Sequence, residues 1–322
     1  MLERSCWICR ERTARQSRSA RRYFAAHRMF ASFLTTILFS LSVIFASRSA
    51  KLLGGTRANL SRILLATGFL ALWAHGFGAG LRGPALPWFF FGGCVGFGLG
   101  DMALFAALPR IGPRQAILIT QCLAAPLAAL VEWAWLGTTL SAAELWCAVF
   151  ILAGVAVALA PDRGVKIERR VFWIGVLAGV GSAIGQGMGA VISRKANAVA
   201  TLAHFPIDGG TAAYQRIIGG LLVTAVSFVF LRRRKLETAP QWRAAVPWTV
   251  ANALAGPAIG VGCFQWALAT TPSGVVLPIV ATSPVVTIVL ARFIDGTHPT
   301  GRAVSGGLIA VIGAVALKRL HG

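Results

Sequence analysis

The chain has 322 residues, of which 56% are hydrophobic and 13% charged, and its mean hydropathy is +0.71. Soluble domains average about 25% charged residues, so this composition excludes a chain made of ordinary soluble domains. The net charge of +21 would suggest nucleic-acid binding in a soluble protein. Here the basic residues lie between apolar runs, where they would face lipid headgroups and water, so we expect no nucleic-acid partner.

Residues 1–28 differ from the rest of the chain, because they hold eight arginines, no glycine and no apolar run. We expect either a disordered basic tail or a start codon assigned too far upstream, with Met29 as the true first residue. Cys6 and Cys9 have the C-x-x-C spacing of half a zinc site or a redox motif, but no second pair or histidine cluster completes it. The sequence therefore predicts no metal site.

Ten apolar stretches follow Met29, each of roughly the length that crosses a hydrocarbon core of about 30 Å as a helix. A β-barrel would need alternating segments of about 10 residues, and these runs do not alternate. The predicted spans are 30–47, 60–78, 87–108, 113–135, 142–160, 171–193, 210–231, 246–269, 273–293 and 303–318. The sequence thus predicts an all-α integral membrane protein that lies in the lipid bilayer.

The spans divide into two halves of five, 29–160 and 161–322, which share short motifs in the same order. The matched motifs are Ser47-Arg48 and Ser193-Arg194, Arg62 and Arg216, Ala107-Leu108 and Ala267-Leu268, Ala125-Pro126 and Ser283-Pro284, GTTLS at 137–141 and GTHPT at 296–300, and AGVAVAL at 153–159 and IGAVAL at 312–317. Because five is odd, the second copy enters the membrane from the opposite side, which predicts two inverted repeats.

At these residues the chain resembles the EamA-type carriers of the drug/metabolite transporter superfamily, over residues 30 to about 318. The resemblance implies a secondary active transporter that exports small metabolites, such as amino acids or drug-like solutes, by alternating access across a bacterial cytoplasmic (inner) membrane. The family tends to have a glycine–glutamate pair after its fourth span, where this chain has Gly137-Thr138 and Gly296-Thr297. A flippase or exporter of lipids or lipid-linked carriers is the alternative, which a groove opening sideways would favour.

Asp101 is the candidate for mechanism, because it follows a glycine run deep inside predicted span three. A carboxylate there is costly, so it is either a protonated structural group, paired with Gln121 or the backbone, or a cavity group that exchanges a proton or holds a substrate cation. Its counterpart in span eight is Val261, so the acid is not required by the repeat. Proton coupling is accordingly the only cofactor-like role predicted.

The other polar candidates are Gln121, Gln186, Gln265, Arg62 and Arg216. Glutamines in spans either bond neighbouring helices or contact substrate. The two arginines either extend to the bilayer surface or attract an anionic substrate. Glu132 lies beside Trp133 and Trp135 at a span end, and we expect it at the bilayer interface.

Glycines four residues apart recur in three spans: Gly92, Gly96 and Gly100; Gly181, Gly185 and Gly189; and Gly256 and Gly260. Small residues let helix backbones approach closely, so the pattern predicts tight packing, and in spans three and eight it also fits the flexible helices of a rocking carrier. Pro126 and Pro284 each remove a helix hydrogen bond, which predicts either static kinks or hinges with carbonyls facing a cavity.

No catalytic constellation is found, since His204 and Asp208 in HFPID are one residue short of the acyltransferase spacing and no nucleophile–histidine–acid set accompanies them. We expect a non-enzymatic protein with a substrate cavity between the repeats. It should be lined by spans one, three, four, six, eight and nine, with spans five and ten at the periphery.

Counted with the span ends from Met29, the connections 1–2, 3–4, 5–6, 7–8 and 9–10 hold 17 Lys and Arg, against six on the opposite side. The positive-inside rule then puts both termini outside the cytosol, although relatives of this kind are usually drawn with both termini inside. A C-terminal green fluorescent protein fusion should stay dark and an alkaline phosphatase fusion should be active. Green fluorescence from the cytosol would contradict this orientation.

Overall fold

The computed structural model describes residues 30–159, 168–231, 241–295 and 301–321, and the regular elements within these ranges are all helices. The predictions made for residues 1–28, including the basic tail and the cysteine pair, lie outside them. Seven helices are long and apolar enough to cross a membrane: Phe30–Leu53, Ala116–Leu136, Ala142–Leu159, Arg169–Leu202, Gly209–Val229, Trp242–Thr270 and Ser273–Leu290. The chain is therefore an all-α protein that crosses the membrane several times.

After the Phe30–Leu53 helix, the elements are α2 (Gly55–Gly76), α3 (Leu86–Gly93), η1 (Cys94–Gly100), α4 (Asp101–Leu136), α5 (Ala142–Leu159), α6 (Arg169–Leu202), α7 (Gly209–Leu231), α8 (Trp242–Ala253), η2 (Leu254–Ala258), α9 (Ile259–Thr270), α10 (Ser273–Val280), α11 (Ser283–Asp295) and α12 (Gly301–His321). The total of ten spans stays a prediction, because α2, the α3–η1 segment and α12 are not among the seven membrane-spanning candidates.

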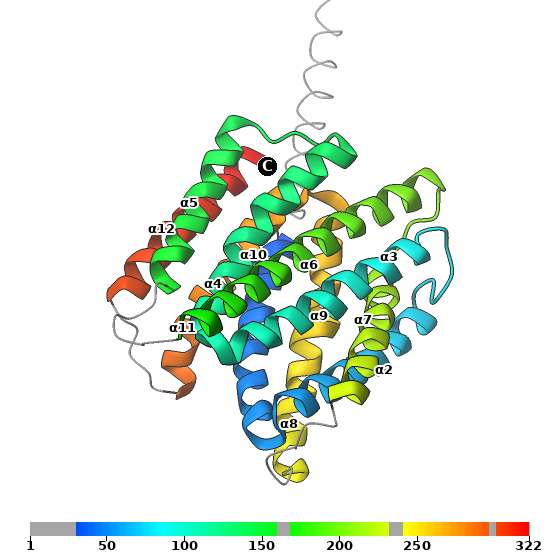
Figure 1. Ribbon diagram of the computed structural model, residues 1–322. Helices are drawn as coiled ribbons and strands as arrows, with labels where there is room; N and C mark the ends of the chain where they lie inside the picture. Colours follow the sequence, from blue (N-terminus) through cyan, green and yellow to red (C-terminus); the bar gives the residue numbers. More distant parts are fainter. Residues whose placement is uncertain (1–29, 160–167, 232–240, 296–300, 322) are drawn as a thin grey trace, which may run out of the picture.

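The chain reverses direction within α4, near Ile111. Gly185 and Gly187 are two residues apart in α6, yet they contact residues that lie far apart in the segment made of η1 and α4. Gly175, near the start of α6, contacts the bend of this segment. The facing pairs are Gly185–Gly100, Gly187–Ala124 and Gly175–Ile111. Helix α6 therefore lies between two arms of one hairpin, and the bend falls between predicted spans three and four (Figure 1).

Glycines bring α6 into backbone contact with η1. Gly96 faces Gly189, and a Cβ added to Gly185 would lie 2.6 Å from the Cα of Gly100. Of the other predicted packing glycines, Gly92 lies against Ile192, Gly181 against Ala103, Gly256 against Ser42, and Gly260 against Phe39. In lipid, where burying apolar surface gives little advantage to helix association, such close approach is a main source of packing energy.

Two π-helical segments, η1 and η2, interrupt the regular helices. They begin at Cys94 and Leu254, an offset of 160 positions, and Ala107 and Ala267 of the predicted repeat have the same offset. Pro257 lies within η2. π-helical turns are rare and are frequently found at functional sites, so their occurrence in two matching stretches marks both as candidate functional elements.

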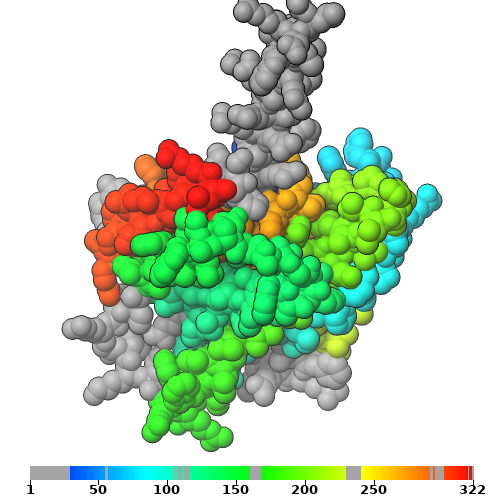
Figure 2. Space-filling model, turned by 90° about the horizontal axis from the view of Figure 1, so that it is seen from above, coloured from blue at the N-terminus to red at the C-terminus, as the bar shows by residue number. Residues whose placement is uncertain are grey.

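Helices α5 and α12 pack against each other along one edge of the bundle, where Figures 1 and 2 show them side by side. Gly154 and Gly306 permit the contact, since a Cβ on either would meet the backbone of the other helix. This edge position agrees with the expected peripheral placement of spans five and ten.

We predict that Gly185→Ala destabilises the protein by about 1–3 kcal/mol, the usual cost of overpacking, because the added methyl group meets backbone atoms that cannot rotate away. Gly68→Ala is the matched control, since a Cβ at Gly68 in α2 meets nothing within 4 Å. Thermal unfolding of the purified variants in detergent should separate them. Equal stability of the two variants would contradict the close contact.

Candidate functional site

A cavity of about 530 Å³ lies between the two halves of the chain. Its volume is within the range of about 300–1,000 Å³ that is typical of small-molecule sites. Both halves contribute to the lining, through the Phe30–Leu53 helix, α2, η1, α4 and the end of α5, and through α6, α7, η2, α9, α10 and α11. The expected spans are thus present. The cavity is also lined by α2 and α7, whose arginines reach it, and by Leu159 at the end of α5, which was expected only at the periphery.

Five of the six predicted polar site residues line this cavity: Arg62, Asp101, Gln121, Gln186 and Arg216. Among the predicted glycines and prolines, Gly96, Gly256 and Pro284 also line it. Gln265 does not, because it is buried in α9, and neither polar atom of its side chain has a hydrogen-bond partner among the described residues. Neither role considered for Gln265, bonding to a neighbouring helix or lining the substrate site, is seen in this structure.

Asp101 is paired with Arg62. Gln121, which was one of the partners considered for a structural Asp101, lines the same cavity. Arg62 Nη2 lies 3.7 Å from Asp101 Oδ2, and Arg62 Nε donates a 2.8 Å hydrogen bond to Asn59 Oδ1. Arg216 is the second cation within electrostatic reach of Asp101. Three charged side chains from α2, α4 and α7 therefore meet inside the protein.

Arg216 is almost completely buried, at 5% exposure. Its Nη1 donates a 2.8 Å hydrogen bond to Ser193 Oγ of α6, and its Cζ lies 5.4 Å from the centre of the Phe97 ring. Its Nε has no partner among the described residues. The alternative that this arginine extends to the bilayer surface is therefore wrong: the protein holds its guanidinium inside, close to η1.

The rest of the lining is largely apolar. Aromatic and aliphatic side chains come from both halves, and Phe39 and Phe264 pack together with ring centres 6.3 Å apart. Val261, the counterpart of Asp101 in the predicted repeat, lines the same cavity. The site thus combines one charged cluster with a broad apolar surface, a composition suited to amphipathic solutes.

The two prolines do not behave alike. Pro284 lies in the first turn of α11, directly after the break that ends α10 at Val280, and it lines the cavity. The Val280 carbonyl accepts a hydrogen bond from the Ser283 hydroxyl. Pro126 lies exposed within α4 and does not line the cavity, so the structure does not show the cavity-facing carbonyl that was one of the two alternatives for this proline.

A buried ion pair closes one end of the site. Arg194 Nε lies 3.0 Å from Glu132 Oε1, and Arg194 Nη1 donates a 2.8 Å hydrogen bond to the Leu268 carbonyl at the end of α9. Glu132 Oε2 accepts hydrogen bonds from the Ser273 N–H, at 2.7 Å, and from the Ser273 hydroxyl at the start of α10. Glu132 is 1% exposed, so the expected interfacial carboxylate is instead a junction of four helices.

This junction lies beyond the cavity along α4, since Glu132 is about 16 Å further along the helix than Gln121. Buried apolar side chains fill the space between. They belong to one cluster, which runs from the cavity-lining Phe264, Leu277 and Val280 to Ala128 and Leu268. Apolar packing followed by a hydrogen-bonded ion pair seals this end.

Asp208 has a structural role. Its Oδ1 accepts hydrogen bonds from the backbone N–H groups of Gly210 and Thr211 and from Trp73 Nε1, and its Oδ2 accepts one from the Thr211 hydroxyl. Burial raises the pKa of Asp208, but these hydrogen bonds lower it by more, so the pKa lies below its ordinary value. The carboxylate thus caps α7 and ties it to α2, which accounts for this residue of HFPID without catalysis.

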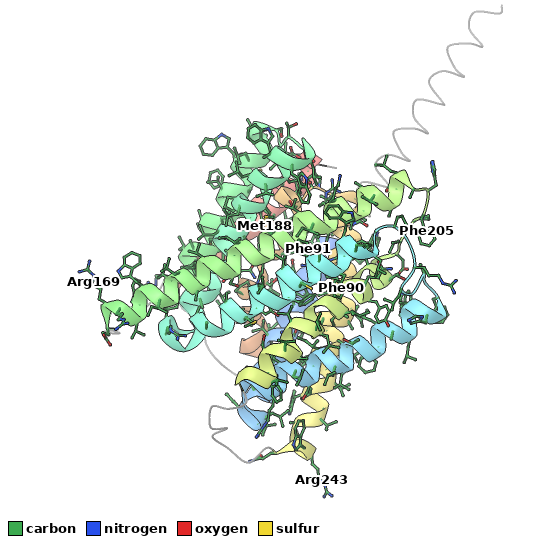
Figure 3. The ribbon with its side chains drawn as sticks, turned by 45° about the vertical axis from the view of Figure 1, so that its right-hand side comes forward. Phe90, Phe91, Arg169, Met188, Phe205 and Arg243 are labelled. Atoms are coloured by element: carbon green, nitrogen blue, oxygen red, sulfur yellow. The ribbon has the colours of Figure 1, made fainter. Side chains whose placement is uncertain are left out.

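Arginines also lie at the starts of two helices, α6 and α8. Figure 3 shows Arg169 at the start of α6 and Arg243 at the start of α8, both pointing away from the helices. These residues belong to the connections that carry the larger share of positive charge.

Comparison with solved structures identifies the same fold elsewhere. In all, 29 chains match, and one crystal structure, 19% identical in sequence, aligns over 92% of this chain and 97% of its own with a TM-score of 0.72. At this identity the likeness shows the fold alone. Curated protein sequences give no significant match.

Fold and cavity together define a multi-pass helical membrane protein with an internal cavity. The family model of EamA-like transporters matches residues 173–318. The match supports the resemblance to EamA-type carriers of the drug/metabolite transporter superfamily, and it lies in the second half of the chain.

We predict that Glu132→Gln lowers the free energy of unfolding by about 1–3 kcal/mol, because it removes the counter-charge of the partly buried Arg194 and weakens the acceptor of the Ser273 N–H. Glu168→Gln is the control, since Glu168 is exposed and its side chain does not cap α6. Thermal unfolding in detergent measures both. If Glu132→Gln is as stable as the control, the ion pair does not hold this end together.

Proposed function

We propose that the protein is a secondary active transporter that exports small metabolites, such as amino acids or drug-like solutes, across a bacterial cytoplasmic membrane. The match of residues 173–318 to the family model of EamA-like transporters supports transport. The observation that carries the proposal is the cavity between the two halves, in which Arg62, Asp101 and Arg216 meet within an apolar lining. No catalytic step is part of the proposal, because a solute needs only to bind and be released.

Alternating access is the proposed mechanism, and the matching of the two halves supports it. The π segments η1 and η2 start at positions that correspond in the predicted repeat, and residues from both line the cavity. In carriers built from inverted repeats, substrate binds at the repeat interface, and one repeat rocks against the other. The close contact between η1 and α6 is a surface over which such movement can occur.

We assign the structure to one state of the transport cycle, in which the cavity is closed at the Glu132–Arg194 pair. To release solute past α4 and α6, the protein must separate Glu132 from Arg194 and open the apolar packing beside them. Both charges would then be exposed to water, which offsets part of the cost of breaking the pair. The ion pair is therefore proposed as the closed gate of the state that the structure describes.

Flux into proteoliposomes tests the proposal, with a metabolite panel sorted by charge and a fluorescent-lipid scrambling assay alongside. We expect saturable movement of at least one solute and none of lipid. The response to an imposed pH gradient should be lost in Asp101→Asn and kept in Glu168→Gln.

Lipid scrambling without solute flux would overturn the proposal in favour of the lipid flippase. An Asp101→Asn variant that responds normally between pH 5.5 and 8 would show that the carboxylate is structural.

A further inference from the structure

The described charged side chains that line the cavity carry a net positive charge. Among the described residues, the cavity lining holds three charged side chains, the cations Arg62 and Arg216 and the anion Asp101. The other polar groups of the lining are neutral: Gln186 from α6, Gln121 from α4, and hydroxyls from the Phe30–Leu53 helix and α11. With Asp101 ionised, one positive charge remains unpaired in a largely apolar site.

The two guanidinium groups also retain unused hydrogen-bond donors. A guanidinium has five N–H donors. Arg216 donates to Ser193, and its buried Nε has no partner. Arg62 donates to Asn59 and is 3.7 Å from Asp101, which is longer than a hydrogen bond. Buried donors of this kind match the planar, two-oxygen geometry of a carboxylate or a similar oxyanion.

Building on the proposed transport function, we propose that the substrate is an amphipathic organic anion that binds together with a proton. Its acidic group lies between Arg62 and Arg216, and its apolar body lies against Phe39, Phe97 and Phe264. The proton binds to the carboxylate of Asp101. A cationic substrate is disfavoured, because two fixed positive charges would face it.

The sign of the coupling follows from the charges. Ionised Asp101 interacts with both arginines, so it offsets the positive potential that would attract an anionic substrate. It also repels the acidic group of a substrate placed beside it. Protonation removes the repulsion and frees both cations for the substrate. Linkage is reciprocal, so the bound anion also favours protonation of Asp101. Anion and proton therefore cross the membrane in the same direction, and their combined gradients decide which direction that is.

Binding to the purified protein in detergent tests this inference with three probes of similar shape. They are 2-phenylethanesulfonate, 2-phenylethanol and 2-phenylethyltrimethylammonium, none of which titrates between pH 5.5 and 8. We expect calorimetric binding of the sulfonate only. Its affinity should be about 5- to 150-fold higher at pH 5.5 than at pH 8, the usual range of coupling between two ligands.

Variants separate the roles of the three charges. Asp101→Asn should bind the sulfonate at pH 8 as tightly as the unmodified protein does at pH 5.5, with no pH dependence. Arg216→Gln should bind it at least about tenfold more weakly at both pH values, which is the loss of one charged hydrogen bond. Glu168→Gln should match the unmodified protein throughout.

A measurement on the unmodified protein guards against a variant that does not fold. Titration with the sulfonate near pH 7 in two buffers of different ionisation enthalpy should show proton uptake on binding. Binding of the ammonium probe, release of protons, no binding of the sulfonate, or loss of sulfonate binding in folded Asp101→Asn would each overturn the inference. Proteoliposome flux of neutral or cationic solutes alone would overturn it as well, yet leave the transport function standing.

Discussion

The structure depends on the contact that glycines allow between α6 and the hairpin on either side of it. Water is absent from the bilayer core, so helices there associate mainly through close packing and hydrogen bonds between them. Gly185 and Gly189 bring α6 against η1, while Gly187 brings it against the other arm of the hairpin. The same helix then presents Gln186 to the cavity, Ser193 to Arg216 and Arg194 to Glu132. Cavity and gate are therefore positioned by one helix.

The charged groups illustrate two ways of keeping ions inside a membrane protein. At the sealed end, Glu132 and Arg194 bond each other at 3.0 Å, and each also bonds a further helix: Arg194 the end of α9 and Glu132 the start of α10. In the cavity, Arg62, Asp101 and Arg216 are held near one another with longer contacts and unused donors. A buried charge is costly unless paired, so the first arrangement suits structure, while the second suits a site that awaits a ligand.

Sequence reasoning identified the helical membrane class, the family resemblance and most of the polar cavity residues, because each is encoded locally. Apolar length reveals a span, and a carboxylate within it, such as Asp101, is conspicuous on energetic grounds. Pairings between distant helices are not encoded in this way. Glu132 appeared interfacial because of its tryptophan neighbours, since its partner Arg194 is 62 positions away. Gln265 and Pro126 carried the right residue types but lie on helix faces that the spacing could not orient.

The π-helical segments were likewise invisible in the sequence, where their glycines predicted only tight packing. The π-helical geometry of η1 affects the direction in which the Asp101 side chain points. It is the first residue after η1, and its direction around the helix axis depends on how many residues the preceding turns hold. A shift of one residue in that register rotates everything beyond it by about 100°, because an α-helix has 3.6 residues per turn. Relaxation of η1 to regular α-helix would thus turn the Asp101 carboxylate away from Arg62 with little movement of the helix as a whole.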